Sequence, residues 1–471
     1  MPFSTQSASN VSSTGATSTT RPNVLVLAVD TQRADHLSCY GYPRLTSPHI
    51  DRLASQGLLF EDAYSEHIPT HPGYTTLFTG KDVFSHQIVT QGGTVELDPG
   101  VRQLAEILRE QGYFTGAADN LGRWFDRGFD AYERYRWDQT SLTEWRKAEA
   151  VNGALLPLLE RAAAAAGKGG KDQPFFVYAH YWDPHTPYLP PPPFSRMFYT
   201  GDERDKDNHS MDPVFGFEPF REYFQHWMGG VTDIRFPIAQ YDAEIAYVDA
   251  ALGHVFTFLE ETGLAENTLV VLTADHGEIL DDHVGYFDHH GLYEGNVHVP
   301  LLMRLPGRLP AGKRVPGFAR LRDVAPTILE AIGLPDVAAQ ERMEGRSLWA
   351  AATSRRAKRT GIDALYLTEC TWMRKRAWRT RDWKLIQAQE PDFHDLPPLE
   401  LYHLQADPQE QHNLADARPD VVTDLLGRME LHATRRLART GLPDPLQSQS
   451  ITLRRIGQVK TAVPEDQKLK A

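Results

Sequence analysis

The sequence predicts an α/β fold: a large mixed, mainly parallel sheet sandwiched by helices, followed by a small antiparallel sheet with a helix. From Arg21 onward, apolar runs typical of buried strands alternate with helix-like segments, as in proteins that place helices on both faces of a parallel sheet. Two of these runs, 23–30 and 268–277, end with acidic residues. Towards the C-terminus, alternating apolar and polar residues over 378–386 indicate antiparallel strands instead.

The predicted helices lie between these strands, and each is recognised by its apolar spacing and by a glycine just after its end. They cover 50–56 before Gly57, 101–111 before Gly112, 148–166 before Gly167 and 241–262 before Gly263. The basic stretch 342–358 is also predicted to be helical.

Changes in composition divide the chain into segments. We expect a disordered tail at 1–20, a catalytic domain at 21–360, a small subdomain at 361–445 and a second tail at 446–471. Within the catalytic domain, 189–237 is typical of a lid-like insertion, because four consecutive prolines are followed by many aromatic residues. These aromatic residues would either recognise an apolar leaving group or only pack the insertion itself.

The overall charge restricts the partners. The 471 residues carry a net charge of −13, which argues against nucleic acid or an anionic membrane as the main partner. Without an apolar run of about 18 residues or a basic and then apolar leader, the expected location is cytoplasmic. Cys39 and Cys370 are too few for a disulfide framework or a thiolate metal site. The sequence leaves a homo-oligomer open.

Asp30, Asp275 and His276 stand at the ends of the two runs with acidic termini. Because the carboxyl ends of parallel strands meet at one edge of a sheet, where such folds bind ligands, these oxygen and nitrogen donors predict a metal site. A third apolar run, 174–182, also ends on polar donors. Any one of these acids alone would be explained as the cap of a loop or helix, but three strands that end alike favour the site.

Thr70 precedes a helix-like segment that extends to Gly80. A threonine followed two residues later by proline is typical of a helix N-cap. The alternative is a nucleophile at a helix N-terminus, where backbone N–H groups favour a negative oxygen and an anionic substrate. The local pattern favours the cap, and the acidic strand ends favour the nucleophile.

Several motifs, taken in order, resemble the sulfatase family within the alkaline phosphatase superfamily. They lie at 30–37, 46–54, 77–81, 273–278, 292–302 and 400–414. The resemblance extends from Arg21 to about Leu414, and it implies an alkaline phosphatase/sulfatase-like fold and a hydrolase that acts on ester bonds.

The resemblance also implies a set of site residues. A divalent metal would be held by Asp30, Asp275 and His276, next to a covalent nucleophile aligned with Thr70. The other residues implied by the resemblance are catalytic His185 and His289 and substrate-binding His86, Gln91, Asn120 and Asp183.

The chain departs from the family pattern at the nucleophile. Formylglycine requires Cys or Ser in a Cys/Ser-X-Pro-X-Arg motif, whereas this chain has Thr70-His71-Pro72-Gly73-Tyr74, without that residue and without the arginine. We therefore expect no formylglycine, and we place the chain in a branch with threonine as nucleophile. Thr31 replaces the second aspartate that usually follows the first, so manganese or zinc is favoured over calcium, which stays possible.

The number of metals is left open. Asp183, His185 and His289 could complete a second metal site, which would act on both the entering and the leaving oxygen, although one metal is favoured. The remaining histidines near these motifs are interpreted as ordinary loop or core residues: His180, His283, His290 and His298.

The predicted function is a metal-dependent hydrolase that cleaves a phosphate, phosphonate or sulfate ester through a metal-bound Thr70 nucleophile, with phosphorus esters favoured. Its partner would be a small anionic ester. The alternatives are a sulfatase without formylglycine, a phospho-group transferase, and a non-catalytic scaffold that binds sulfated or phosphorylated ligands.

Overall fold

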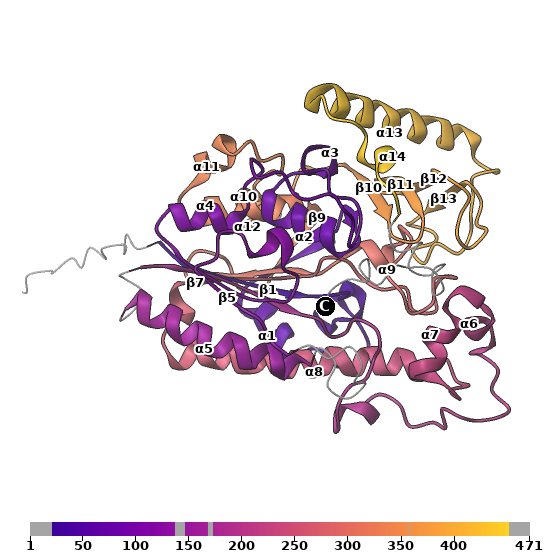
Figure 1. Cartoon of the computed structure of the whole chain (residues 1–471), viewed down its shortest axis with the longest axis horizontal. Helices are drawn as coiled ribbons and strands as arrows, with labels where there is room; N and C mark the ends of the chain where they lie inside the picture. The colour runs from indigo at the N-terminus through magenta and orange to yellow at the C-terminus, as the bar shows by residue number, and fades with distance from the viewer. Residues whose placement is uncertain (1–20, 137–146, 168–172, 357, 452–471) are drawn as a thin grey trace, which may run out of the picture.

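The computed structural model describes residues 21–136, 147–167, 173–356 and 358–451. It contains a large sheet between two helical layers, with a smaller sheet and the last long helix at one end (Figure 1). This is the predicted fold class. None of the helices in these residues is both long and apolar enough to cross a bilayer.

The large sheet has eight strands, and β8 alone among these eight runs antiparallel to its neighbours. In spatial order the strands are β5 (Ala131–Glu133), β4 (Phe114–Ala118), β6 (Phe175–Tyr181), β1 (Asn23–Val29), β7 (Thr268–Thr273), β8 (Leu301–Arg304), β2 (Leu58–Tyr64) and β9 (Lys313–Arg320). Every residue of β1 and β7 is buried, as expected of central parallel strands covered on both faces.

Alternate residues of β1 belong to two different hydrophobic clusters, because successive side chains of a strand point to opposite faces. Leu25, Leu27 and Val29 pack in one cluster, and Val24 and Val26 pack in the other. The first cluster includes residues of α1 (Pro48–Gln56), α5 (Ala148–Ala166) and α8 (Arg235–Glu261). The second includes residues of α2 (Thr70–Thr79), α4 (Leu104–Glu110), α10 (Leu321–Ala331), α11 (Pro335–Gln340) and α12 (Trp349–Thr353).

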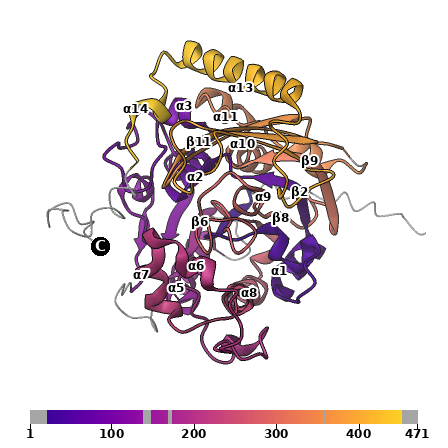
Figure 2. The same ribbon diagram turned by 90° about the vertical axis from the view of Figure 1, so that its right-hand side faces the viewer.

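The second sheet joins distant parts of the chain. Its strands are β13 (Leu399–His403), β12 (Trp383–Ala388), β11 (Arg374–Thr380), β10 (Ala364–Cys370) and the short β3 (His67–Ile68). The first four pair antiparallel, as predicted, but β3 pairs parallel with β10. Figure 2 shows α13 (Pro419–Thr440) lying across this sheet. Because β3 ends two residues before α2 begins, the second sheet helps to hold the start of α2.

The insertion at 189–237 contains α6 (Asp212–Gly216) and α7 (Glu218–Met228). Phe220 of α7 packs against Trp372 and Phe393, with ring centroids 4.9 and 5.7 Å apart. The insertion therefore contacts the C-terminal part of the chain through an aromatic cluster, and its role as a lid stays a prediction.

Four of the predicted helices have different bounds in the structure. The differences are small for α1 and α4, which cover Pro48–Gln56 and Leu104–Glu110 instead of 50–56 and 101–111. The helix predicted at 241–262 begins at Arg235, so α8 includes the end of the predicted insertion. Within the described residues of 342–358, only Trp349–Thr353 (α12) is α-helical, so the prediction of a helix over the whole stretch is wrong. A side chain at Gly345 would lie 1.8 Å from the carbonyl oxygen of Arg322, so this stretch packs closely against the backbone of α10 before α12 begins.

Candidate active site

The ends of β1 and β7 bring Asp30, Asp275 and His276 together. One ligand atom from each lies within 4.8 Å of the other two, and all three side chains are fully buried. β1 and β7 pair in parallel, so the residues that follow them emerge at the same edge of the sheet. Within the part of the chain that the structure describes, no second group of three such ligands lies this close together. The second metal stays a prediction.

The ring of His276 is oriented for coordination. Its Nδ1 lies 2.9 Å from the carbonyl oxygen of Gly277, to which it donates, so Nε2 keeps its lone pair. Nε2 lies 3.2 Å from Asp275 Oδ2, 3.9 Å from Asp30 Oδ1 and 3.3 Å from Thr70 Oγ1. Three side-chain oxygens therefore lie within 3.9 Å of this nitrogen.

The carboxylates of this group fit a cation. Asp30 Oδ1 and both side-chain oxygens of Asp275 are buried without a hydrogen-bond partner among the described residues. Such atoms are costly unless an ion or a donor is bound. Two ligands about 2.1 Å from one ion and at roughly 90 to 110° lie about 3.0 to 3.4 Å apart, which matches the separation of His276 Nε2 and Asp275 Oδ2. The residues present therefore fit one divalent metal.

The two acids differ in their electrostatic environment. Burial, and then the nearby charge of Asp30, raises the pKa of Asp275 to about 6. Burial alone would also raise the pKa of Asp30, but the hydrogen bond from His180 and the nearby His185 hold it well below its usual value. The pair thus contains one carboxylate that is stabilised as an anion and one that is not.

Thr70 is the first residue of α2 and is 3 % exposed. Pro69 occupies the N-cap position, and no side-chain cap hydrogen bond is present at this helix end, so the interpretation of Thr70 as a cap is wrong. A side chain at Gly73 would lie 2.8 Å from the carbonyl oxygen of Asp275, which shows how closely α2 approaches the end of β7. This close approach places the Thr70 hydroxyl next to His276.

His185 and His289 lie beside the metal group. The ring of His289 stacks on that of His276 with centroids 4.9 Å apart, and His185 lies 4.8 Å from His289. Burial lowers the pKa of His289 to about 3, so its ring is neutral at physiological pH. The structure therefore brings both predicted catalytic histidines beside the metal group.

Asp183 lies in the segment that follows β6, two residues before His185. Burial, and then the charge of Glu244, raises its pKa well above the usual value. Glu244 Oε1 lies 3.3 Å from Lys147 Nζ, so Asp183 belongs to a buried group formed with α5 and α8. A role in substrate binding stays a prediction.

The other predicted pocket residues hold neighbouring segments of the chain. His86 uses both ring nitrogens, with Nε2 3.0 Å from Thr76 Oγ1 and Nδ1 accepting from the backbone N–H of Ile88. Gln91 accepts from the backbone N–H of His71, and Asn120 pairs with the backbone of Tyr135. Substrate contacts of these three residues stay a prediction.

His180 is the residue that the sequence analysis missed, because it was interpreted as an ordinary core residue. Its Nε2 lies 3.1 Å from Asp30 Oδ2, and its Nδ1 lies 2.9 Å from Asp119 Oδ1. Although burial alone would lower its pKa, the bonds to Asp119 and Asp30 raise it to about 9. The sequence did contain a signal for His180, which is a histidine inside an apolar run. That run forms β6, the neighbour of the strand that ends before Asp30.

Comparison with known proteins supports the family. The model of the sulfatase family matches residues 22–334, and that of the C-terminal region of N-sulphoglucosamine sulphohydrolase matches 282–435. An N-acetylglucosamine-6-O-sulfatase from Bacteroides thetaiotaomicron is 24% identical over 84% of this chain and 83% of its own length. A multifunctional alkaline phosphatase superfamily protein from Trinickia caryophylli is 28% identical over 67% of this chain and 74% of its own length.

Solved structures share the fold. A phosphonate monoester hydrolase of Agrobacterium radiobacter has a TM-score of 0.67 at 23% identity and covers 89% of this chain and 96% of its own. A protein solved in complex with its substrate D-glucosamine-2-N,6-O-disulfate has a TM-score of 0.68 at 20% identity and covers 91% and 100%. Because the family model covers more than half of the sequence, this chain belongs to the sulfatase family of hydrolases that act on ester bonds.

Proposed function

We propose that this protein is a metal-dependent hydrolase of small anionic esters with Thr70 as its nucleophile, and that phosphate or phosphonate esters are favoured over sulfate esters. The observation that carries the proposal is the position of the Thr70 hydroxyl, 3.3 Å from His276 Nε2, the nitrogen that groups with the unpartnered carboxylate oxygens of Asp30 and Asp275. A hydroxyl at a helix N-terminus beside a cation site is suited to attack an anionic ester.

Asp30, Asp275 and His276 would hold the metal ion. One nitrogen and few oxygen donors favour manganese or zinc, with calcium as the alternative. When bound, the ion supplies positive charge that offsets the negative charge of the reacting group and makes a nearby hydroxyl easier to deprotonate. Thr31 replaces the usual second aspartate and so removes one carboxylate, which is why manganese or zinc is favoured over calcium.

The chemistry of the chain itself has two steps. In the first, Thr70 Oγ1 forms a bond to phosphorus while the bond to the leaving oxygen breaks, and a histidine passes the threonine proton to that oxygen. In the second, a water oxygen forms a bond to phosphorus while the bond from phosphorus to Thr70 Oγ1 breaks, and a histidine passes a proton of that water to Oγ1. His289, which burial keeps neutral, and His185 beside it are suited to this proton transfer.

The nucleophile also decides between phosphorus and sulfur. A formylglycine hydrate releases sulfate by collapsing to the aldehyde, and a threonine ester has no such exit. The motif Thr70-His71-Pro72-Gly73-Tyr74 therefore favours phosphorus esters. The similarity to both a sulfatase and a phosphonate monoester hydrolase keeps sulfate esters as the second candidate.

The test is turnover of four p-nitrophenyl esters: the sulfate, the phosphate, a phosphate diester and a phenylphosphonate. Each is assayed with Mn²⁺, Zn²⁺ or Ca²⁺ and with Thr70→Val, which keeps the shape of the side chain without its hydroxyl. Thr79→Ala is the matched control, because Thr79 is a buried threonine of the same helix whose hydroxyl donates to the carbonyl of Thr75.

Phosphorus-ester turnover that is lost in Thr70→Val and kept in Thr79→Ala supports the proposal. Sulfate turnover above all phosphorus esters would replace it with a sulfatase that works without formylglycine. Absence of turnover with every ester and metal would favour a non-catalytic scaffold.

A further inference from the structure

The edge of the sheet carries more buried negative charge than the metal group alone. Asp30, Asp275 and Asp119 are all fully buried. Buried carboxylates are costly unless cations or hydrogen-bond donors face them. In the Cys/Ser-X-Pro-X-Arg motif the last residue is a cation, but here that position is Tyr74. Without that arginine, the buried acids depend on hydrogen-bond donors from other parts of this chain.

His180 lies between two of these acids. Its Nε2 faces Asp30 Oδ2 at 3.1 Å, and its Nδ1 faces Asp119 Oδ1 at 2.9 Å. The two ring nitrogens thus each face one carboxylate oxygen, so the ring fixes the orientation of the Asp30 carboxylate relative to Asp119. His180 binds one oxygen of Asp30 and leaves the other, Oδ1, towards His276 and the metal position.

The surroundings of His180 hold its ring in place. Asp119 also accepts a hydrogen bond from Tyr132, whose hydroxyl in turn accepts from the backbone N–H of Gly122. The ring of Trp182 lies 4.5 Å from that of His180. Residue 180 pairs with Ala28 in the sheet, two residues before Asp30, so the strand register sets the height of the ring beside the ligand.

Tyr74, which stands at the position of the motif arginine, packs against His180. Thr70 and Tyr74 are four residues apart in α2 and share a helix face. The ring of Tyr74 lies 4.9 Å from that of His180, edge to face, and its hydroxyl is buried without a hydrogen-bond partner in the described chain. Burial, and then Asp275 among the nearby charges, raises the pKa of this hydroxyl well above its usual value.

We propose that His180, held by Asp119, is a positioning residue for the metal ligand Asp30. The inference rests on the metal site of the proposed function. Hydrogen-bonding partners behind a metal ligand orient it, and their loss typically weakens metal binding about 10-fold to 100-fold.

The test measures Mn²⁺ binding to metal-free protein by isothermal titration calorimetry, so it does not depend on turnover. His180→Ala is expected to weaken Mn²⁺ binding about 10-fold or more, and Asp119→Asn to weaken it less, because the amide oxygen still accepts from Nδ1.

His36→Ala is the matched control. His36 is a buried histidine 2.7 Å from the buried carboxylate of Asp242, so its removal disturbs a similar pair elsewhere. It is expected to keep the Mn²⁺ affinity of the wild type. If it weakens binding as much as His180→Ala does, the effect is general destabilisation and the inference fails. Circular dichroism and thermal melting in EDTA show whether each variant folds.

The outcomes separate the two proposals. Wild-type affinity in a folded His180→Ala overturns the inference and leaves the proposed function intact. If His180→Ala does not fold, His180→Gln and Asp119→Asn decide, and wild-type affinity in both overturns it. A wild type that binds no divalent ion removes the metal site of the proposed function, and the inference falls with it.

Discussion

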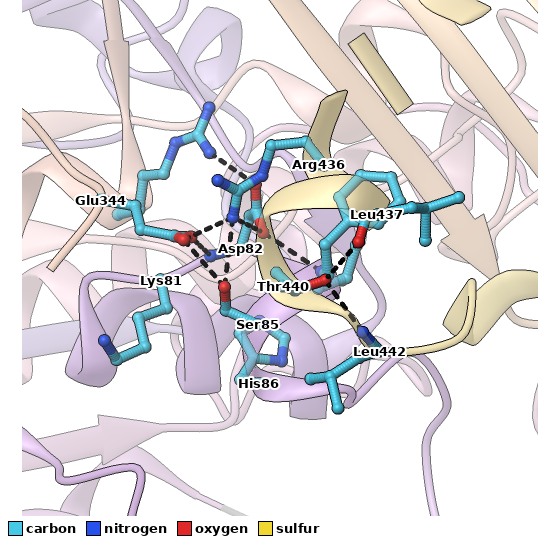
Figure 3. Close-up of polar contacts among 12 residues, drawn as sticks. Lys81, Asp82, Ser85, His86, Glu344, Arg436, Leu437, Thr440 and Leu442 are labelled. Atoms are coloured by element: carbon cyan, nitrogen blue, oxygen red, sulfur yellow. Dashed lines mark hydrogen bonds and ion pairs between the residues drawn. The ribbon is translucent and has the colours of Figure 1, made fainter. Parts of the chain in front are cut away.

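Two groups of acids in this protein differ in whether cationic side chains pair with them. The first is the metal group of Asp30, Asp275 and His276, in which three carboxylate oxygens are without a hydrogen-bond partner within the described residues. The second, shown in Figure 3, joins α13 to α3 (Val83–His86) through Arg436. We call it the Arg436 cluster: Asp82, Ser85, Arg322, Glu344 and Arg436.

In the Arg436 cluster, each acid faces at least one guanidinium group. Asp82 lies 2.9 Å from Arg436 and 3.0 Å from Arg322, and Glu344 contacts Arg436. Arg322 also lies 2.8 Å from Glu66, just before β3, which links the cluster to the segment that leads to Thr70. The comparison teaches that buried acids stabilise the fold where arginine side chains pair with them. Where no cation of the described chain pairs with them, they are available to bind a metal ion.

The largest difference between the groups should appear when one acid of each is neutralised. Asp275→Asn removes a metal ligand, so we expect kcat/KM to fall at least 10³-fold, about 4 kcal/mol. Without metal, the same change removes the repulsion with Asp30, and the melting temperature in EDTA should stay equal or rise.

Asp82→Asn is the counterpart in the Arg436 cluster. It leaves two arginines with a weaker partner, so the melting temperature should fall while kcat/KM of the folded protein changes little. Steady-state kinetics and thermal melting of both variants check the pair. A loss of activity without a loss of stability in Asp82→Asn would contradict the division between the groups.

The next largest effect is expected for Arg436→Leu. Breaking a buried ion pair from one side typically costs about 3 to 5 kcal/mol. Here Glu344 loses the guanidinium group of Arg436, while Asp82 keeps that of Arg322. We expect the free energy of unfolding in urea to fall by about 3 kcal/mol. Arg435→Leu, at the exposed neighbouring position, is the control and should cost little. Equal losses in both variants would show that the cluster contributes nothing specific.

Metal binding should stabilise the folded protein through the metal group and not through the Arg436 cluster. Mn²⁺ at about 100 times its dissociation constant should raise the free energy of unfolding by about 2.7 kcal/mol. The gain should disappear in Asp275→Asn and persist in Arg436→Leu, since Arg436 is not a ligand. Thermal melting with EDTA or Mn²⁺ measures it, and a gain retained by Asp275→Asn would place the ion elsewhere.

The smallest effect concerns a histidine beside the Arg436 cluster. Burial lowers the pKa of His86 to about 3, below the unfolded value of about 6.5. The unfolded state therefore binds more protons at pH 5, and stability present above pH 6.5 is lost on acidification. One such histidine contributes about 2 kcal/mol between pH 7 and pH 5.

His86→Gln should reduce this loss by about that amount, as measured by urea unfolding at the two pH values. His254→Gln, at an exposed position of α8, is the control and should behave as the wild type. An unchanged pH dependence in His86→Gln would show that the ring is protonated in the folded protein.

Much of the fold and the centre of the site were predictable, because they depend on local patterns. The helix at 148–166 has the predicted bounds, and the apolar runs at 23–29 and 268–273 are central strands. Asp30, Asp275 and His276 follow directly from the rule that parallel strands end at one edge. The replacements at Thr70 and Tyr74 were also visible without a structure.

What the sequence determined is therefore the order of the elements, the acidic strand ends and the presence of Thr70 at the motif position of Cys or Ser, since each depends on residues close together in the chain. The tertiary structure decided the rest. The pairing of β3 with β10, the contact of Arg436 with Asp82 and the position of His180 between Asp30 and Asp119 join residues 61 to 354 positions apart. Such contacts arise when elements pack, and no local pattern of charge or hydrophobicity encodes which distant partner a buried side chain will meet.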